Sequence, residues 1–256
     1  TPQVSGGLAL GMPYYNIDNK GVIVFPPIFD PPTFYRDFPN NNVIYTAGDP
    51  ALLAYFNTLT AQGAPNAATT LANIGGNMSA VYGILDSRTQ NLARVKTSGI
   101  DFYARYRHET GFGAVFFDVN GPRILNFQNQ SSPTAALVDA MPFGFTNLRV
   151  SSSLGAEIGN LRTQMTWNHS GGLRLIPVAS TLNQDKVSAY NVFNLFMQYK
   201  VPGDSMIAKD LVFSLNVDNL FDKDPPLYRG ADASLFGVRN GFTLGRLVRI
   251  GLSKKF

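Results

Sequence analysis

Hydrophobic and polar residues alternate along most of the chain after about residue 100, the pattern of strands with one apolar and one polar face. Near the C-terminus, Val248, Ile250 and Leu252 fall on one side and Arg249 and Ser253 on the other. The alternation predicts strands at 100–107, 114–127, 148–154, 161–168, 187–200, 209–218 and 244–256. A further long strand is predicted over 8–25, interrupted at Pro13 and by a turn-like segment at 16–21.

The connections between these strands alternate in length. Short links are predicted at 108–112, 155–160 and 201–208, and long ones at 128–143, 171–186 and 220–241. In an up-and-down meander, this order puts all short turns at one end of the sheet and all long loops at the other. Outer-membrane barrels show this asymmetry, with short periplasmic turns and longer extracellular loops. The C-terminus then falls at the periplasmic end.

One long extracellular loop is predicted over 27–86, because this placement keeps the strands alternating up and down. It carries a helix at 48–59, with Asp49 as N-cap and Pro50 at the first helical position. The apolar side of this helix is predicted to carry Leu52, Leu53, Phe56 and Leu59.

Composition removes several classes of protein. No segment approaches the run of about 18 apolar residues of a spanning helix, which excludes a helical membrane protein. Strands that expose only every second residue to lipid remain compatible with a mean hydropathy of -0.02. The net charge is +4, but the basic residues are scattered through the strands, which favours lumen and interface charges over nucleic-acid binding. The chain has no Cys, as suits passage through an oxidising periplasm.

Two segments carry a family resemblance. Residues 216–226 (NVDNLFDKDPP), followed by 243–256 (TLGRLVRIGLSKKF), resemble the C-terminal signature of TonB-dependent outer-membrane receptors. Residues 91–101 (NLARVKTSGID) are similar to a second motif of that family. The resemblance covers the chain from about residue 8 to residue 256.

The resemblance implies an all-β fold: an antiparallel up-and-down transmembrane β-barrel. Residues 1–256 would supply about eight C-terminal strands of a barrel of about 22 strands, with the plug domain absent from this chain. It implies energy-coupled uptake of a scarce nutrient of the siderophore, haem, cobalamin or oligosaccharide class in the outer membrane of a Gram-negative bacterium. The expected partners are outer-membrane lipid, TonB through the missing plug, and the barrel-assembly machinery. Leu252 and Phe256 of the closing strand are the expected assembly signal.

Ligand contacts in such a receptor are expected on the long loops. The candidates are aromatic and charged loop residues, namely Phe34, Tyr35, Arg36, Arg174, Tyr228 and Arg229. The competing interpretation is that each is an ordinary loop residue. Four arginines at lumen-facing strand positions are expected to pair with acidic groups of the barrel or plug: Arg105, Arg107, Arg149 and Arg162.

No catalytic or metal site is predicted, and neither an enzyme, a cofactor nor a nucleic-acid partner is expected. His108 and His169 fall at opposite ends of the predicted sheet, so they cannot share a metal or a catalytic triad. Asp222 and Asp224 lie beside prolines at a loop start, where carboxylates usually form turns. Two alternatives stay open: a passive channel or small structural barrel that closes against 8–25, and a soluble β-sandwich binding module that folds without detergent.

Overall fold

The structure is a computed structural model with two compact units. It describes residues 3–4, 7–44, 49–63, 69, 72–73, 75, 77, 79, 81, 83–141, 146–175, 184–203, 209–228, 237–238 and 244–255. The sheet unit comprises Thr1–Ile17, Thr97–Phe127 and Asp139–Phe256, and the loop unit comprises Asp18–Lys96 and Gln128–Val138.

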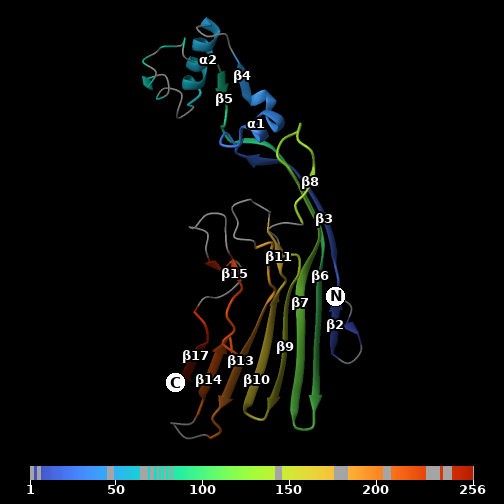
Figure 1. Ribbon diagram of the computed structural model, residues 1–256. Coiled ribbons are helices and arrows are strands. Elements are labelled where there is room, and N and C mark those ends of the chain that lie inside the picture. Colours follow the sequence, from blue (N-terminus) through green and yellow to red (C-terminus); the bar gives the residue numbers. More distant parts are fainter. Residues whose placement is uncertain are drawn as a thin grey trace. The chain divides into compact units, whose positions relative to one another are not determined.

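The main sheet is an antiparallel meander whose strands follow chain order (Figure 1). Its path runs through β1 (Gln3–Val4), β2 (Leu8–Gly11), β6 (Gln90–Thr110), β7 (Gly113–Gln130), β9 (Arg149–Ile158), β10 (Leu161–Ser170), β13 (Tyr190–Lys200), β14 (Leu211–Asp218) and β17 (Leu247–Lys254). Off this path, β3 (Tyr14–Val24) pairs with β6, and β8 (Val138–Asp139) pairs with β7. The predicted all-β, up-and-down class is therefore confirmed, and the eight predicted strands are all present.

The predicted turn at 155–160 is too long. Strand β9 continues through Gly155 to Ile158, and the turn is reduced to residues 159–160, where Gly159 has a φ of 54°. The strand has a glycine at position 155 because a Cβ there would lie 2.3 Å from the Phe116 ring. This glycine therefore marks close packing within the sheet.

The segment 8–25 breaks only once. Residues Met12 and Pro13 separate β2 from β3, as predicted, but the turn expected at 16–21 is wrong because these residues belong to β3. Polar residues lie on this strand because they have partners across it: the Asp18 carboxylate pairs with Arg94 of β6 at 2.6 Å.

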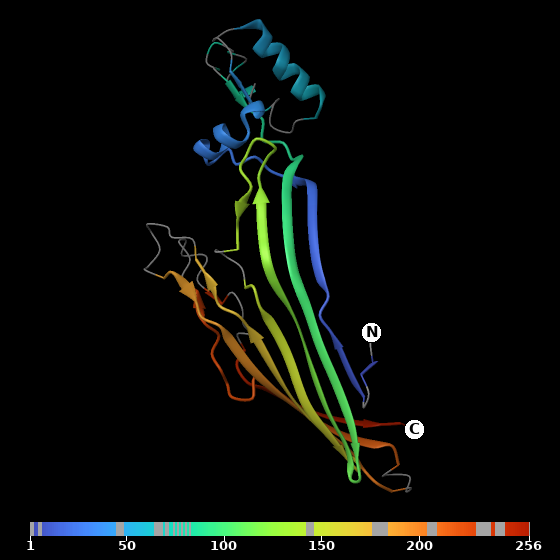
Figure 2. The same ribbon diagram turned by 90° about the vertical axis from the view of Figure 1, so that its right-hand side faces the viewer.

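The loop unit contains the predicted helix as α2 (Pro50–Ala61), seen lengthwise in Figure 2. The Asp49 side chain caps it, accepting a hydrogen bond from the backbone N–H of Ala51 at 2.9 Å. Three α2 residues are buried in an apolar cluster with Ile84 of β5 (Gly83–Leu85): Leu52, Phe56 and Leu59. Leu53 was wrongly placed on this side and is exposed. No described helix has both the length and the apolar character needed to cross a membrane.

A second helix, α1 (Pro31–Asp37), was not predicted. It leads through the 3-10 turn η1 (Pro39–Asn41) into β4 (Asn42–Ile44), which pairs with β5. This segment was predicted as part of the long loop at 27–86, yet proline is tolerated in the first helical turn, where its missing N–H has no helical partner to lose. Phe34 and Phe38, four residues apart, are both fully buried and hold the short helix in place.

A cluster of hydrogen bonds, called here the Asn219 cluster, follows β14. Asn219 is only 2% exposed and has a φ of 53°. Its amide nitrogen donates to the carbonyl of Lys223 at 3.0 Å, and its amide oxygen accepts from the N–H of Lys223 at 2.8 Å. Its own backbone N–H donates to the side chain of Asn194 in β13 at 2.9 Å. One side chain thus closes the turn while its backbone is tied to the neighbouring strand.

The Asn219 cluster extends to the start of β17. Asp222, with a φ of 53°, accepts a hydrogen bond on its side chain from the N–H of Arg246 at 2.7 Å. Phe221 packs edge-on against Phe193 of β13, with ring centroids 5.4 Å apart. Residues 216–226, which resemble a family signature, therefore connect β13, β14 and β17 through hydrogen bonds and ring packing. Their residue types had indicated a turn.

Candidate functional site

One face of the sheet unit is apolar across strands β7 to β17. The strand register aligns its residues in rows. One row comprises Phe117, Leu154, Met165, Leu195, Val217 and Val248, the next Val115, Ala156, Thr163, Met197, Leu215 and Ile250, and the third Ile158, Leu161, Tyr199, Phe213 and Leu252. Many of these side chains are open to their surroundings, with Leu154 64% and Ile250 81% exposed. An apolar surface of this extent is typical of an interaction with a membrane or another protein.

The opposite face is polar and carries ion pairs. Glu157 pairs with Arg107 at 2.8 Å and with Arg162 at 3.4 Å, while Arg105 pairs with Asp118 at 2.8 Å. The expected pairing of these three arginines with acidic groups is thereby confirmed within the sheet. Arg249 on β17 pairs with Asp218 on β14 at 2.7 Å. Arg149 shares this face, since it lies opposite Ser170, but has no ion pair with a described residue.

Aromatic and histidine side chains mark both ends of the apolar face. At the long-loop end, Trp167 and His169 of β10 share one partner: the Asn191 side-chain oxygen lies 3.0 Å from the Trp167 Nε1 and 2.8 Å from the His169 Nδ1. At the short-turn end, Tyr106 and His108 of β6 stack with ring planes 6° apart. Such amphipathic rings favour the boundary between lipid and water. The two histidines lie at opposite strand ends, as predicted, and no cluster of metal-ligating residues occurs in the described ranges.

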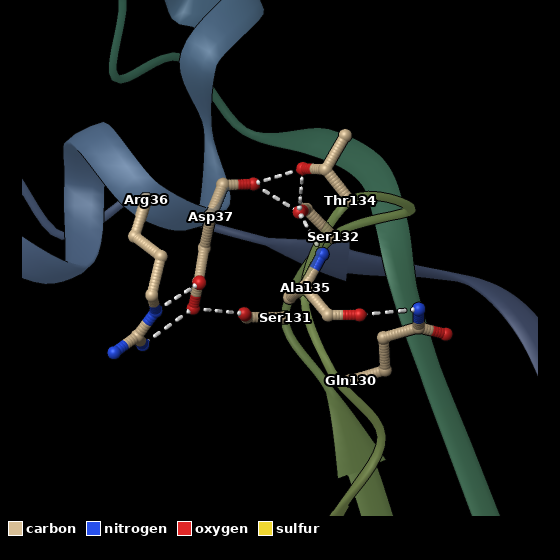
Figure 3. Close-up of polar contacts among 7 residues, drawn as sticks. All are labelled: Arg36, Asp37, Gln130, Ser131, Ser132, Thr134 and Ala135. Carbon is tan, nitrogen blue, oxygen red and sulfur yellow. Dashed lines mark hydrogen bonds and ion pairs between the residues drawn. The ribbon is translucent and has the colours of Figure 1, made fainter.

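The loop unit contains a polar cavity of about 450 Å³ between η1, the segment 86–92 and residues 132–134. Its walls are joined by hydrogen bonds: Asn41 donates its amide to the Asp86 carbonyl at 2.9 Å. Figure 3 shows the second junction, where the Asp37 carboxylate lies between Arg36 and Ser131, at 2.6 Å and 2.8 Å.

The backbone carbonyl of Asp37 completes this junction. It accepts hydrogen bonds from the hydroxyls of Ser132 and Thr134 (Figure 3). Arg36 and Ser131 hold the pKa of the Asp37 carboxyl below its usual range, against the opposing effect of burial. Arg88 likewise lowers the pKa of Asp86 by hydrogen bonding. Each carboxylate of this cavity therefore has its own cation, and the cavity is balanced in charge.

Acid is expected to loosen this junction. Because the folded-state pKa of Asp37 is below its ordinary value of 3.8, its contribution to stability is present above that value and is lost as the pH falls below it. The protection factor of the Ala135 N–H, which donates to Ser132, is its intrinsic exchange rate divided by the measured rate, and it should fall below about pH 4. Asp37→Asn should exchange faster at neutral pH and lose most of this pH dependence.

The matched control for this prediction is Asp49→Asn, because asparagine caps a helix about as well as aspartate. This variant should keep the pH dependence of the Ala135 exchange unchanged. A protection factor in the unsubstituted protein that does not change between neutral pH and about pH 3 would show that Asp37 does not hold the junction.

A second cavity, of about 690 Å³, lies in the sheet unit beside the hairpin of β11 (Leu173–Arg174) and β12 (Lys186–Val187). The hairpin extends β10 and β13 at their long-loop end. Leu173, Leu175 and Val187 are buried together under it. Arg174 and Lys186 both line the cavity, together with Met141 and Asn147.

The structure separates the six predicted ligand residues. Phe34 is fully buried in the loop unit, so its side chain serves packing, whereas Tyr35 is half exposed and Arg36 is paired with Asp37. Among the predicted ligand residues whose side chains the structure describes, only Arg174 lines one of the two cavities. Tyr228 ends β15 (Leu227–Tyr228), which pairs with β16 (Gly237–Val238).

The remaining predicted positions lie at or beyond the described strands. Arg229 and Phe256 lie outside the described residues, while Leu252 lies exposed in β17 opposite Phe213. The ligand and assembly roles stay predictions. Sequence reasoning did not single out Lys186, although its position before a long strand and within a loop containing Arg174 was a usable signal.

Comparison with known proteins gives a partial likeness in structure alone. No protein-family model and no curated protein matches the sequence. Among solved structures, the chain is similar to the FrpB iron transporter from Neisseria meningitidis (F3-3 variant), with 20% identity and a TM-score of 0.41 over 66% of this chain. It is also similar to the copper transporter OprC, with 24% identity and a TM-score of 0.38 over 64% of this chain. This chain covers 25% of the length of the first transporter and 24% of the length of the second.

Proposed function

We propose that this chain forms the C-terminal portion of the β-barrel of a TonB-dependent outer-membrane receptor, which takes up a scarce nutrient by energy-coupled transport. The nutrient belongs to the siderophore, haem, cobalamin or oligosaccharide class. The receptor resides in the outer membrane of a Gram-negative bacterium, meets TonB through a plug domain and uses its closing strand, with Leu252 and Phe256, in barrel assembly.

The observation that carries this proposal is the division of one sheet into an apolar and an ionic face. An ordinary two-layer domain would bury the apolar face against a second layer. Here Leu154, Met165 and Ile250 stay exposed while Arg107, Glu157 and Arg162 pair on the other side. In a membrane barrel, the first face meets lipid and the second lines a wet interior. Strands β9 and β10, of 10 residues each, have the length that crosses a bilayer at a tilt.

The alternatives differ in what meets each face. A soluble β-sandwich would cover the apolar face with protein, and a passive channel or small structural barrel would keep the lipid contact but join β17 to β2 and β3. The family motifs at 91–101 and 216–226 favour the receptor over the channel, since both fall where the meander requires them, in β6 and after β14.

Spin labelling tests the proposal directly, because these 256 residues contain no cysteine and any cysteine elsewhere in the full-length protein can be replaced by serine. Met165→Cys places a nitroxide on the apolar face, and Thr166→Cys places the matched control on the ionic face of the same strand. In the full-length protein in lipid bilayers, the label at 165 should collide with oxygen dissolved in lipid, and the label at 166 with a water-soluble nickel reagent. Equal accessibility at the two sites would exclude a membrane barrel.

A further inference from the structure

The hairpin of β11 and β12 holds two cations directly opposite each other. Leu173 faces Val187 across the hairpin, and Arg174 faces Lys186. Because side chains alternate between the faces of a strand, the first pair points to the buried cluster and the second to the other side. Like charges directly opposite in a two-stranded ladder are unfavourable, so this arrangement needs compensation.

The described residues supply no counter-ion. Neither Arg174 nor Lys186 takes part in an ion pair with a described residue. The segment 171–189 contains one acidic residue, Asp185. Its carbonyl accepts from the Leu175 N–H at 2.9 Å, which continues the ladder and puts Asp185 on the face of the apolar pair. The contrast with the loop-unit cavity is clear, because Arg36 and Arg88 there each have a carboxylate.

The unpaired cations line a cavity large enough for a small organic ligand. Its volume is about 690 Å³, and the residues that line it include Asn147 and Ser188 beside the two charged residues. Arginine offers a planar fork of N–H donors that matches a carboxylate, and lysine offers three further donors. All charged groups of this wall are donors, so the chemistry selects an anion with several acceptor oxygens.

From this juxtaposition we propose that Arg174 and Lys186 form a binding site for a small polycarboxylate anion at the long-loop end of the sheet. Arg174 takes one carboxylate in a two-point contact, Lys186 takes a second, and Asn147 and Ser188 bind the remaining polar groups. The inference rests on the proposed function for its biological meaning: in a receptor, this site selects an anionic nutrient or an anionic metal chelate. Binding itself does not depend on transport.

Titration calorimetry with citrate on the purified full-length protein in detergent tests the site. The unsubstituted protein should bind citrate and should bind acetate and inorganic phosphate more weakly by about tenfold or more, since each offers a single anionic group. Arg174→Gln and Lys186→Gln should each weaken citrate binding by roughly tenfold, as expected for the loss of one charge-assisted contact. Either variant removes a repulsion between like charges, so both should remain folded.

The matched control is Lys209→Gln, an exposed lysine in the turn before β14 at the opposite end of the sheet. It should bind citrate as the unsubstituted protein does. Absence of binding heat, equal affinities for phosphate and citrate, or equal loss in Lys209→Gln and Arg174→Gln would each overturn the proposal. If citrate does not bind but the label at Met165 is exposed to lipid, the anion site is wrong and the receptor proposal stands. If citrate binds but the labels at 165 and 166 are equally accessible, the receptor proposal is wrong and the anion site stands.

Discussion

Replacing Leu154 by lysine is expected to destabilise the membrane-embedded protein by about 2 to 4 kcal/mol, the cost of a cation on the lipid face near the bilayer midplane. Leu154 lies in the middle of β9, is 64% exposed, and belongs to the row of apolar side chains that includes Phe117 and Met165. Lysine there must lose much of its hydration or deform the bilayer around it. Unfolding by urea from lipid vesicles measures this change in free energy.

The adjacent variant Ser153→Lys is the control, because it adds the same side chain to the same strand on the opposite face. Register places Ser153 opposite Asp118 and Thr166, so the added ammonium meets water and a carboxylate. Its cost should stay below about 1 kcal/mol, as for most exposed substitutions. Equal costs at 153 and 154, or a larger cost at 153, would mean that the apolar face does not meet lipid.

The faces of the sheet were predictable because a strand repeats every two residues. Once Val248, Ile250 and Leu252 are assigned to one side, the same period assigns Phe213 and Leu215 on β14, and the register in the structure brings them together. Errors arose where one residue type has two physical roles. Gly155 was assigned to a turn, although it serves close packing against Phe116, and Pro31 was assigned to the long loop, although it opens α1.

The cavities were harder to predict than the sheet, because their walls come from segments far apart in the chain. Asp37 meets Ser132 across 95 positions, and no local pattern marks that contact. Arg174 was chosen for its charge and its loop, but the chemistry of its site depends on Lys186 lying directly opposite. That relation requires the register of a hairpin, which the length of the loop alone does not determine.

Asn219→Ala is expected to reduce stability by about 1 to 3 kcal/mol, because it removes both side-chain hydrogen bonds to the backbone of Lys223, whose carbonyl then keeps only the bond from the Tyr190 hydroxyl. Alanine also adopts the left-handed backbone conformation only at a cost of about 1 kcal/mol, whereas glycine adopts it without this cost. Asn219→Gly should therefore be less destabilised than Asn219→Ala by about 1 kcal/mol, although both lose the same side-chain hydrogen bonds. Urea unfolding of the three proteins measures the two contributions separately.

The Asn219 cluster should also stabilise the start of β17, because the Asp222 side chain accepts a hydrogen bond from the N–H of Arg246. Loss of the Asn219 side chain frees the turn that positions Asp222, so hydrogen exchange should rise first at Arg246 and then along β17. Asn160→Ala, an exposed asparagine in the two-residue turn between β9 and β10, is the control and should change neither stability nor exchange in β17. If Asn219→Ala is as stable as this control, the signature segment does not hold β17. If exchange rises equally in every strand, the Asn219 cluster contributes only to global stability, and β17 is positioned by its pairing with β14 alone.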